Sequence, residues 1–259
     1  MRVLVACEFS GTVRDAFNAR GHDAWSCDLL PTEVVGPHYQ GDVLDLLEGW
    51  QPVVFADDLE ECNVCDERLC LIHDMHFSEC PCIGPTQDGV EYKQVGEVLL
   101  GRPEDHPNWD LMIAHPPCTY LCSSGLHWNK RVEGREAKTQ EALEFVQRLL
   151  DAPIEKIALE NPIGRIGTAI RPADQIIQPW QFGHDASKQT ALWLKNLPLL
   201  RPTEIIHPRI VNGKKRWANQ TDSGQNRLGP SEDRWKLRSE TYRGIAEAMA
   251  DQWGWYIDE

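Results

Sequence analysis

The alternation of short apolar runs with amphipathic segments constrains the fold of this 259-residue chain more than any other feature. Residues 2–7 read as an apolar strand, the turn around Gly11 leads into a helix, and residues 24–27 read as a second strand that ends at Asp28. The pattern continues later in the chain, with strands expected at 111–114, 157–159 and 191–194 and helices at about 135–150 and 240–252. Strands that alternate with helices predict an α/β fold with a mostly parallel sheet and helices on both faces.

Polar motifs follow several of these strands. The carboxyl ends of parallel strands meet at one edge of a sheet, and ligands bind beyond that edge. We therefore expect one site to collect the motifs at residues 8–11, 28, 116–118 and 160–162. An acidic residue in the position of Asp28 commonly binds the ribose of a nucleoside, but the turn at 8–11 alone is also compatible with a purely structural connection.

The charge of the chain is unevenly distributed. The net charge of −14 by itself disfavours a polyanionic partner, but residues 41–112 hold 17 acidic and only 3 basic side chains. Residues 201–243 hold 10 basic and 5 acidic side chains, which leaves a basic stretch for an anionic substrate.

The overall composition limits the class of protein. With 41% hydrophobic and 25% charged residues, and no apolar run near the ~18 residues of a membrane span, it excludes a disordered, fibrous or membrane-spanning protein. The N-terminus lacks the long apolar run and cleavage site of a signal peptide, so we expect a cytoplasmic protein with no membrane partner.

Cys118 and Glu160 are the candidate catalytic residues. Cys118 follows Pro116 and Pro117, whose fixed φ angles make a stiff loop that can hold a thiol in one position. A thiolate is a nucleophile, and we expect desolvation behind a buried strand to raise the pKa of Glu160 so that it acts as an acid. Taken singly, Cys118 can equally be a small core residue and Glu160 a helix-capping carboxylate.

Together, these motifs resemble the cytosine carbon-5 DNA methyltransferase family. The nucleophile loop of that family, Pro-Pro-Cys followed by a Ser-x-x-Gly-like element, is similar to residues 116–125, and its Glu-Asn-Pro signature is similar to residues 160–162. The turn at 9–11, Asp28, Asp42 and the segment 242–246 fit the family by their order along the chain. The resemblance covers most of residues 1–45 and 109–255, and it implies a Rossmann-like fold that binds S-adenosyl-L-methionine.

The resemblance also implies roles for individual residues. Cys118 would add to carbon 6 of cytosine while Glu160 hydrogen-bonds or protonates ring nitrogen 3, and a base in duplex DNA would have to flip out. The residues implied to bind S-adenosyl-L-methionine are Glu8, Phe9, Ser10, Gly11, Asp28, Leu29, Asp42, Val43 and Pro116. The residues expected to contact the substrate are Pro117, Ser123, Asn161, Lys188, Gln189, Lys214, Arg216 and Arg227.

The segment expected to recognise the substrate, residues 198–238, is short. It is too short for the large target-recognition domain of restriction-system methyltransferases, and the nearest counterpart of the family's Gln-x-Arg-x-Arg motif is Lys188-Gln189. Its basic residues, with Trp217 and Trp235, suit a nucleic-acid backbone and bases, or else form a solvated loop with both tryptophans packed on the core. The pattern resembles small phage-encoded members of the family, which would act in the cytoplasm of a bacterial host.

A cysteine and histidine cluster interrupts the predicted catalytic domain, which consists of residues 1–56 and 106–259. We expect residues 57–105 to form a zinc-binding insertion, because the cluster has structural-zinc spacing and this acidic region has few apolar residues. Four of the candidates are needed, and reduced surface thiols are the alternative. The first choice is Cys62, Cys65, His76 and Cys80, with Cys82 as the main competitor.

Several functions stay open from the sequence. The leading hypothesis is S-adenosyl-L-methionine-dependent methyl transfer to carbon 5 of cytosine in DNA, with single-stranded or weakly sequence-specific DNA as the substrate. The short recognition segment also fits the same chemistry on a free cytidine nucleotide, and the atypical Thr12-Val13 pair leaves open a cofactor that carries a group larger than methyl. A non-catalytic protein that binds nucleic acid is the alternative from a different class.

Overall fold

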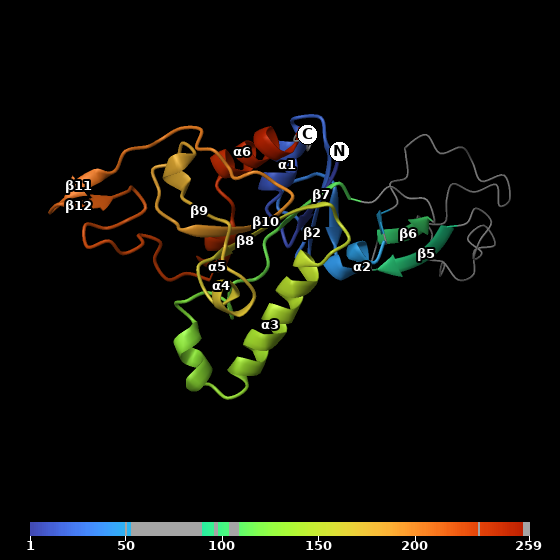
Figure 1. Ribbon diagram of the computed structural model, residues 1–259, viewed down its shortest axis with the longest axis horizontal. Helices are drawn as coiled ribbons and strands as arrows, with labels where there is room; N and C mark the ends of the chain where they lie inside the picture. Colours follow the sequence, from blue (N-terminus) through green and yellow to red (C-terminus); the bar gives the residue numbers. More distant parts are fainter. Residues whose placement is uncertain (50, 53–89, 96–97, 104–108, 233, 256–259) are drawn as a thin grey trace.

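A seven-stranded sheet forms the centre of the molecule (Figure 1). The computed structural model describes residues 1–49, 51–52, 90–95, 98–103, 109–232 and 234–255. The strand order is β3-β2-β1-β7-β8-β10-β9, and the first five of these strands are parallel. They are β1 (Arg2–Ala6), β2 (Asp23–Asp28), β3 (His38–Gln40), β7 (Leu111–Ala114) and β8 (Lys156–Pro162). β10 (Thr190–Lys195) is antiparallel both to β8 and to β9 (Gln175–Ile177), so the predicted mostly parallel sheet is confirmed.

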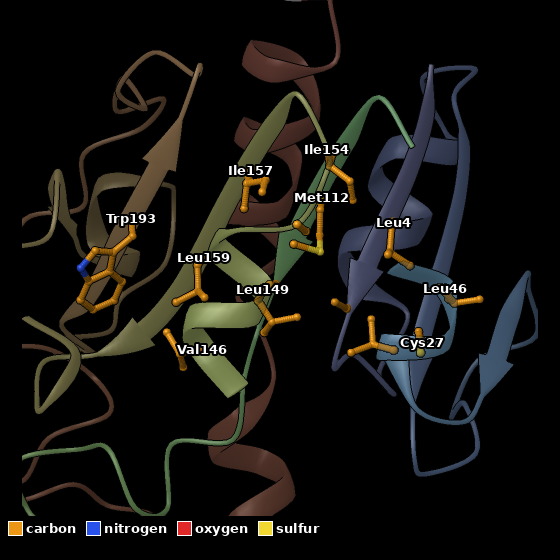
Figure 2. Close-up of a cluster of buried hydrophobic side chains, with 14 of the residues drawn as sticks. Leu4, Cys27, Leu46, Met112, Val146, Leu149, Ile154, Ile157, Leu159 and Trp193 are labelled. Carbon is orange, nitrogen blue, oxygen red and sulfur yellow. The ribbon is translucent and has the colours of Figure 1, made fainter. Parts of the chain in front are cut away.

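Helices cover both faces of this sheet, because its strands are apolar on both sides. In β1, Val3 and Val5 face one layer while Leu4 and Ala6 face the other, and all four are fully buried. The first layer contains α1 (Thr12–Asn18) and α6 (Arg243–Trp253), which contact each other. The second layer contains α2 (Val43–Leu47), α3 (Arg135–Leu150) and α4 (Ile166–Ala169). Figure 2 shows part of the second layer, where Val146 and Leu149 of α3 lie beside Leu159 of β8.

The observed elements differ from the predicted ones mainly at their ends. The strand predicted at 157–159 extends to Pro162, because Thr190 of β10 still pairs with Pro162, so the Glu160-Asn161-Pro162 motif lies within β8. The last helix begins at Arg243 instead of 240, since Tyr242 has extended backbone angles. Sequence patterning missed the short elements β9, α5 (Arg234–Ser239) and the hairpin of β11 (Arg209–Val211) and β12 (Lys214–Arg216).

Two smaller sheets lie outside the central one. The β11–β12 hairpin projects from one end of the molecule (Figure 1). A three-stranded antiparallel sheet consists of β4 (Gln51–Pro52), β6 (Val98–Pro103) and β5 (Val90–Val95). The predicted zinc ligands Cys62, Cys65, His76, Cys80 and Cys82 lie outside the described residues. In the part of the chain that the structure describes, no helix has the length and apolarity to cross a membrane, and no group of three or more potential metal ligands occurs.

Candidate active site

The carboxyl ends of β1, β2, β7 and β8 meet at one edge of the sheet, as their parallel pairing requires. β1 pairs with β2 on one side and with β7 on the other, so the strand order reverses direction between β1 and β7. Open α/β sheets bind ligands at such a switch point. A cavity of about 40 Å³ lies there, and it is lined by Cys7, Glu8, Phe9, Ser10, His115, Ser239, Glu240 and Thr241.

The turn between β1 and α1 forms one wall of this cavity. Glu8 is buried, and its carboxylate accepts hydrogen bonds from the backbone N–H groups of Val13 at 2.7 Å and Arg14 at 3.2 Å. Gly11 has a φ of 72°, and a Cβ atom there would come within 2.5 Å of Nη2 of Arg14. The Glu8 side chain therefore caps α1, while the turn around it contributes the predicted residues Phe9 and Ser10 to the cavity.

The acidic residues predicted after β2 and β3 lie near the same wall. Asp28 and Asp42 both raise the pKa of the Cys7 thiol by their charge, in addition to the larger effect of burial. Asp28 Oδ1 accepts from the Leu30 N–H at 2.9 Å, and Asp42 caps α2 by accepting from the Leu44 N–H at 3.0 Å. The structure thus brings the two carboxylates to the cavity region.

Leu29 and Val43, which follow Asp28 and Asp42 in the sequence, do not have side chains at the cavity. Val43, predicted to lie beside the cofactor, has its side chain in the core. Leu29, also predicted there, is 74% exposed. Neither side chain lines the cavity at the switch point.

The loop after β7 carries Cys118. The backbone O of Cys118 accepts hydrogen bonds from the N–H groups of Leu121 and Cys122, both at 3.0 Å, which fold the loop into a helical turn. The loop is fixed to the segment after β8, because the Ser123 N–H donates to O of Ile163 at 3.1 Å and the Arg165 N–H to O of Leu121 at 2.7 Å. Ser123, predicted to contact the substrate, thus fixes the loop through its backbone, and its side chain is exposed.

Asn161 holds the start of the same loop. Its buried side chain donates from Nδ2 to the backbone O of Pro116 at 2.7 Å, while its Oδ1 has no partner among the described residues. Pro116 is buried, whereas Pro117 and Cys118 are exposed. Pro117 and Cys118 thus lie at the surface, although the thiol group itself is partly desolvated, and Asn161, predicted to touch the substrate, positions the loop.

Glu160 is joined to the residue at the end of β7. Its Oε2 lies 2.8 Å from Nδ1 of His115, and only 13% of the Glu160 side chain is exposed. Burial raises the pKa of Glu160, but the hydrogen bond and charge of His115, with smaller effects from Lys188 and Thr190, outweigh it and lower the pKa. The expectation that the pKa of Glu160 is raised was therefore wrong, because the sequence did not reveal its His115 partner.

The environment of the Cys118 thiol favours the protonated form. Desolvation raises its pKa, and the charges of Cys122 and Glu160 add to this effect, whereas Lys188 lowers it. Lys188, predicted to contact the substrate, is thus close enough to act on both catalytic candidates. Its Nζ donates to the backbone O of Glu240 at 3.2 Å, which links it to the cavity wall.

The other predicted substrate residues lie toward the hairpin or on the surface. Lys214 is exposed at the start of β12, and Gln189 is exposed just before β10. Arg216 donates from Nε to O of Asp222 at 3.0 Å, and Arg227 donates from Nε to O of Gln220 at 3.0 Å. These two guanidinium groups therefore help to hold the loop that follows the hairpin.

Of the two tryptophans predicted to contact nucleic acid, Trp217 and Trp235, the structure describes the side chain of Trp217. Trp217 is partly buried, and its ring stacks on Trp180 with a centroid distance of 5.8 Å and an interplanar angle of 21°. Its ring is thus packed against another partly buried aromatic side chain, which belongs to neither of the two core clusters. Nothing is described of the Trp235 side chain.

Two residues of the site were not singled out from the sequence. His115 directly precedes the Pro-Pro-Cys motif, and that position is the only sequence signal for it. Gly164 lies where the two loops touch, and a Cβ atom there would come within 2.0 Å of the backbone O of Leu121. Its signal was its place two residues after the Glu-Asn-Pro motif.

Comparisons with known proteins identified no family for this chain. A scan against models of protein families found none that matches the chain, and a search of curated proteins found no match.

Proposed function

We propose that this protein transfers a methyl group from S-adenosyl-L-methionine to carbon 5 of cytosine in DNA. The observation that carries the proposal is that Cys118 and Glu160 lie at the same sheet edge as the cavity at the switch point. Such an arrangement suits two ligands that react with each other, one held at the switch point with a small part of it in the cavity, and one facing the thiol.

The residues around the cavity fit a polar, nucleoside-containing cofactor. Nε2 of His115 is buried without a partner among the described residues, and unsatisfied buried polar atoms of this kind favour a bound ligand. Asp28, at the end of β2, has the position that suits ribose hydroxyls. S-adenosyl-L-methionine would supply an electrophilic methyl group there.

The chemistry of the chain's own residues suits addition to a cytosine ring. The thiolate of Cys118 would form a bond to carbon 6 as the C5–C6 double bond opens, and the freed electron pair makes carbon 5 nucleophilic toward the methyl group. After methyl transfer, loss of the carbon-5 proton to water would re-form the double bond and release the Cys118 thiolate. The ionised Glu160 can accept a hydrogen bond from the amino group at carbon 4, and its position fixes the ring edge next to nitrogen 3. Because the pKa of Cys118 is raised, the thiol must lose its proton when the base is bound.

DNA is favoured as the substrate by the basic hairpin. Lys214 and Lys215 are exposed on β12, and the exposed Arg227 follows in the next loop. Clustered cations of this kind bind a phosphate backbone, and a paired target base would have to flip toward Cys118. Structural zinc in the 57–105 segment remains a prediction from the sequence, which metal analysis of the purified protein tests.

A labelled methyl-transfer assay tests the proposal. Protein is incubated with labelled S-adenosyl-L-methionine and duplex DNA, single-stranded DNA or deoxycytidine nucleotides, and the product base is identified by mass spectrometry. We expect 5-methylcytosine in DNA, no product with Cys118→Ala, and retained activity with Cys122→Ser, a control on the same loop. Full activity of Cys118→Ala, or no transfer to any substrate by the unaltered protein, would overturn the proposal. Transfer to nucleotides alone would support the alternative substrate instead.

A further inference from the structure

His115 lies between the cavity and the catalytic carboxylate. His115 lines the cavity together with Glu8, and its Nδ1 lies 2.8 Å from Oε2 of Glu160. Only 8% of the His115 side chain is exposed. The pairing follows from strand register, because Ala114 of β7 is opposite Leu159 of β8, so the next residues along both strands are His115 and Glu160.

The two ring nitrogens of His115 have different surroundings. Since the pKa of Glu160 is lowered, its carboxylate is ionised at neutral pH and only accepts hydrogen bonds, so Nδ1 carries the proton and donates. Nε2 is buried and has no partner among the described residues. A buried nitrogen without a partner favours a ligand that supplies one, and His115 is one of the residues that line the cavity.

We propose that His115 is a positioning residue that connects the two halves of the site, with Nδ1 holding the Glu160 carboxylate in one orientation and Nε2 bonding a polar group of the ligand in the cavity. This inference rests on the proposed function. It assigns the cavity ligand and the substrate base to opposite ends of one imidazole ring, so that occupancy of the cavity fixes the ring against Glu160.

The groups around this pair determine what loss of the ring does. Glu160 is influenced by His115, Lys188 and Thr190, and the Glu160 charge in turn acts on Cys118; His115 also faces the charge of Glu8. His115 contributes the largest effect that lowers the pKa of Glu160, and burial acts in the opposite direction. Without the ring we expect that pKa to rise, so that Glu160 becomes protonated at a higher pH than in the unaltered protein.

Two substitutions separate the two nitrogens. His115→Phe removes both, whereas His115→Asn keeps a donor near the position of Nδ1 and removes Nε2. We expect His115→Phe to move the acidic limb of the kcat/KM profile to higher pH and to lower kcat about 10–100-fold. We expect His115→Asn to restore that limb, while both variants bind S-adenosyl-L-methionine about 10-fold more weakly by calorimetry, as for the loss of one hydrogen bond.

A spectroscopic measurement keeps this test independent of activity. The Glu160 carboxyl is titrated by carbon-13 NMR in glutamate-labelled protein, with Glu160→Gln identifying its signal, and circular dichroism verifies that each variant folds. A pH midpoint for Glu160 that is unchanged in folded His115→Phe, or unchanged cofactor affinity in both variants, would overturn the inference. If the unaltered protein shows no methyl transfer while the Glu160 midpoint shifts as expected, the proposed function fails but the His115–Glu160 coupling stands.

Discussion

Replacing Gly164 by alanine tests whether contact between two loops positions the nucleophile. Gly164 follows β8 and touches the loop that carries Cys118. A Cβ atom would lie 2.0 Å from the backbone O of Leu121 and 2.8 Å from Cα of Cys122, although ordinary van der Waals contact begins near 3.4 Å. The two nearest atoms belong to the backbone, so the clash cannot be relieved by rotating a side chain, and the loops must separate by roughly an ångström.

This separation of the loops affects both the stability of the protein and the rate of the reaction. Overpacking of this kind typically costs about 1–3 kcal/mol, which corresponds to about 2–4 °C in Tm per kcal/mol for a chain of this size. A displacement of about 1 Å at a reacting atom can lower the rate about 100-fold. We therefore expect Gly164→Ala to lower the rate about 100-fold and the Tm by about 2–12 °C.

Thermal melts and single-turnover methyl transfer measure the two effects. Gly167 is the matched control, because it lies three residues further on in α4 and a Cβ atom there meets nothing within 4 Å. Gly167→Ala is expected to keep the activity and the Tm of the unaltered protein. The reasoning is refuted if Gly164→Ala retains full activity and Tm, or if the two variants behave alike.

Individual side chains give three further predictions. Arg14 is fully buried and donates hydrogen bonds to Ser26, Thr32 and the backbone O of Val34. Arg14→Met is therefore expected to lower the free energy of unfolding, measured by urea titration, by about 3 kcal/mol, whereas the exposed control Arg243→Met is expected to lower it by less than about 1 kcal/mol. Because the pKa of Cys118 is raised, its thiolate fraction grows as pH rises from 7 to 9, and the rate of covalent adduct formation in stopped-flow assays should grow with it; a flat profile would contradict this. Replacing Lys214 and Lys215 by alanine should weaken DNA binding and lower the slope of log affinity against log salt by up to about 2, whereas an unchanged slope would remove the hairpin from the interface.

Local patterns in the sequence were sufficient to predict the main helices and strands of the fold. The strand at Leu111–Ala114 and the helix at Arg135–Leu150 have the predicted bounds, because apolar periodicity is a property of neighbouring residues. The antiparallel direction of β10 could not be predicted in this way, since it depends on pairing partners that no local pattern specifies. The β11–β12 hairpin did have a local signal that was missed, because its turn is Asn212-Gly213, with φ angles of 49° and 74°.

The sequence by itself determined which residues could react and that they follow strands. The parallel sheet brought these residues to one edge, as expected, but the partners of each side chain were decided only by the tertiary structure. Glu160 illustrates the difference, because burial alone would make it an acid and the His115 contact, 45 residues away, keeps it ionised. That contact exists because β7 and β8 pair in the register of Ala114 with Leu159, and register depends on the packing of whole strands against the core.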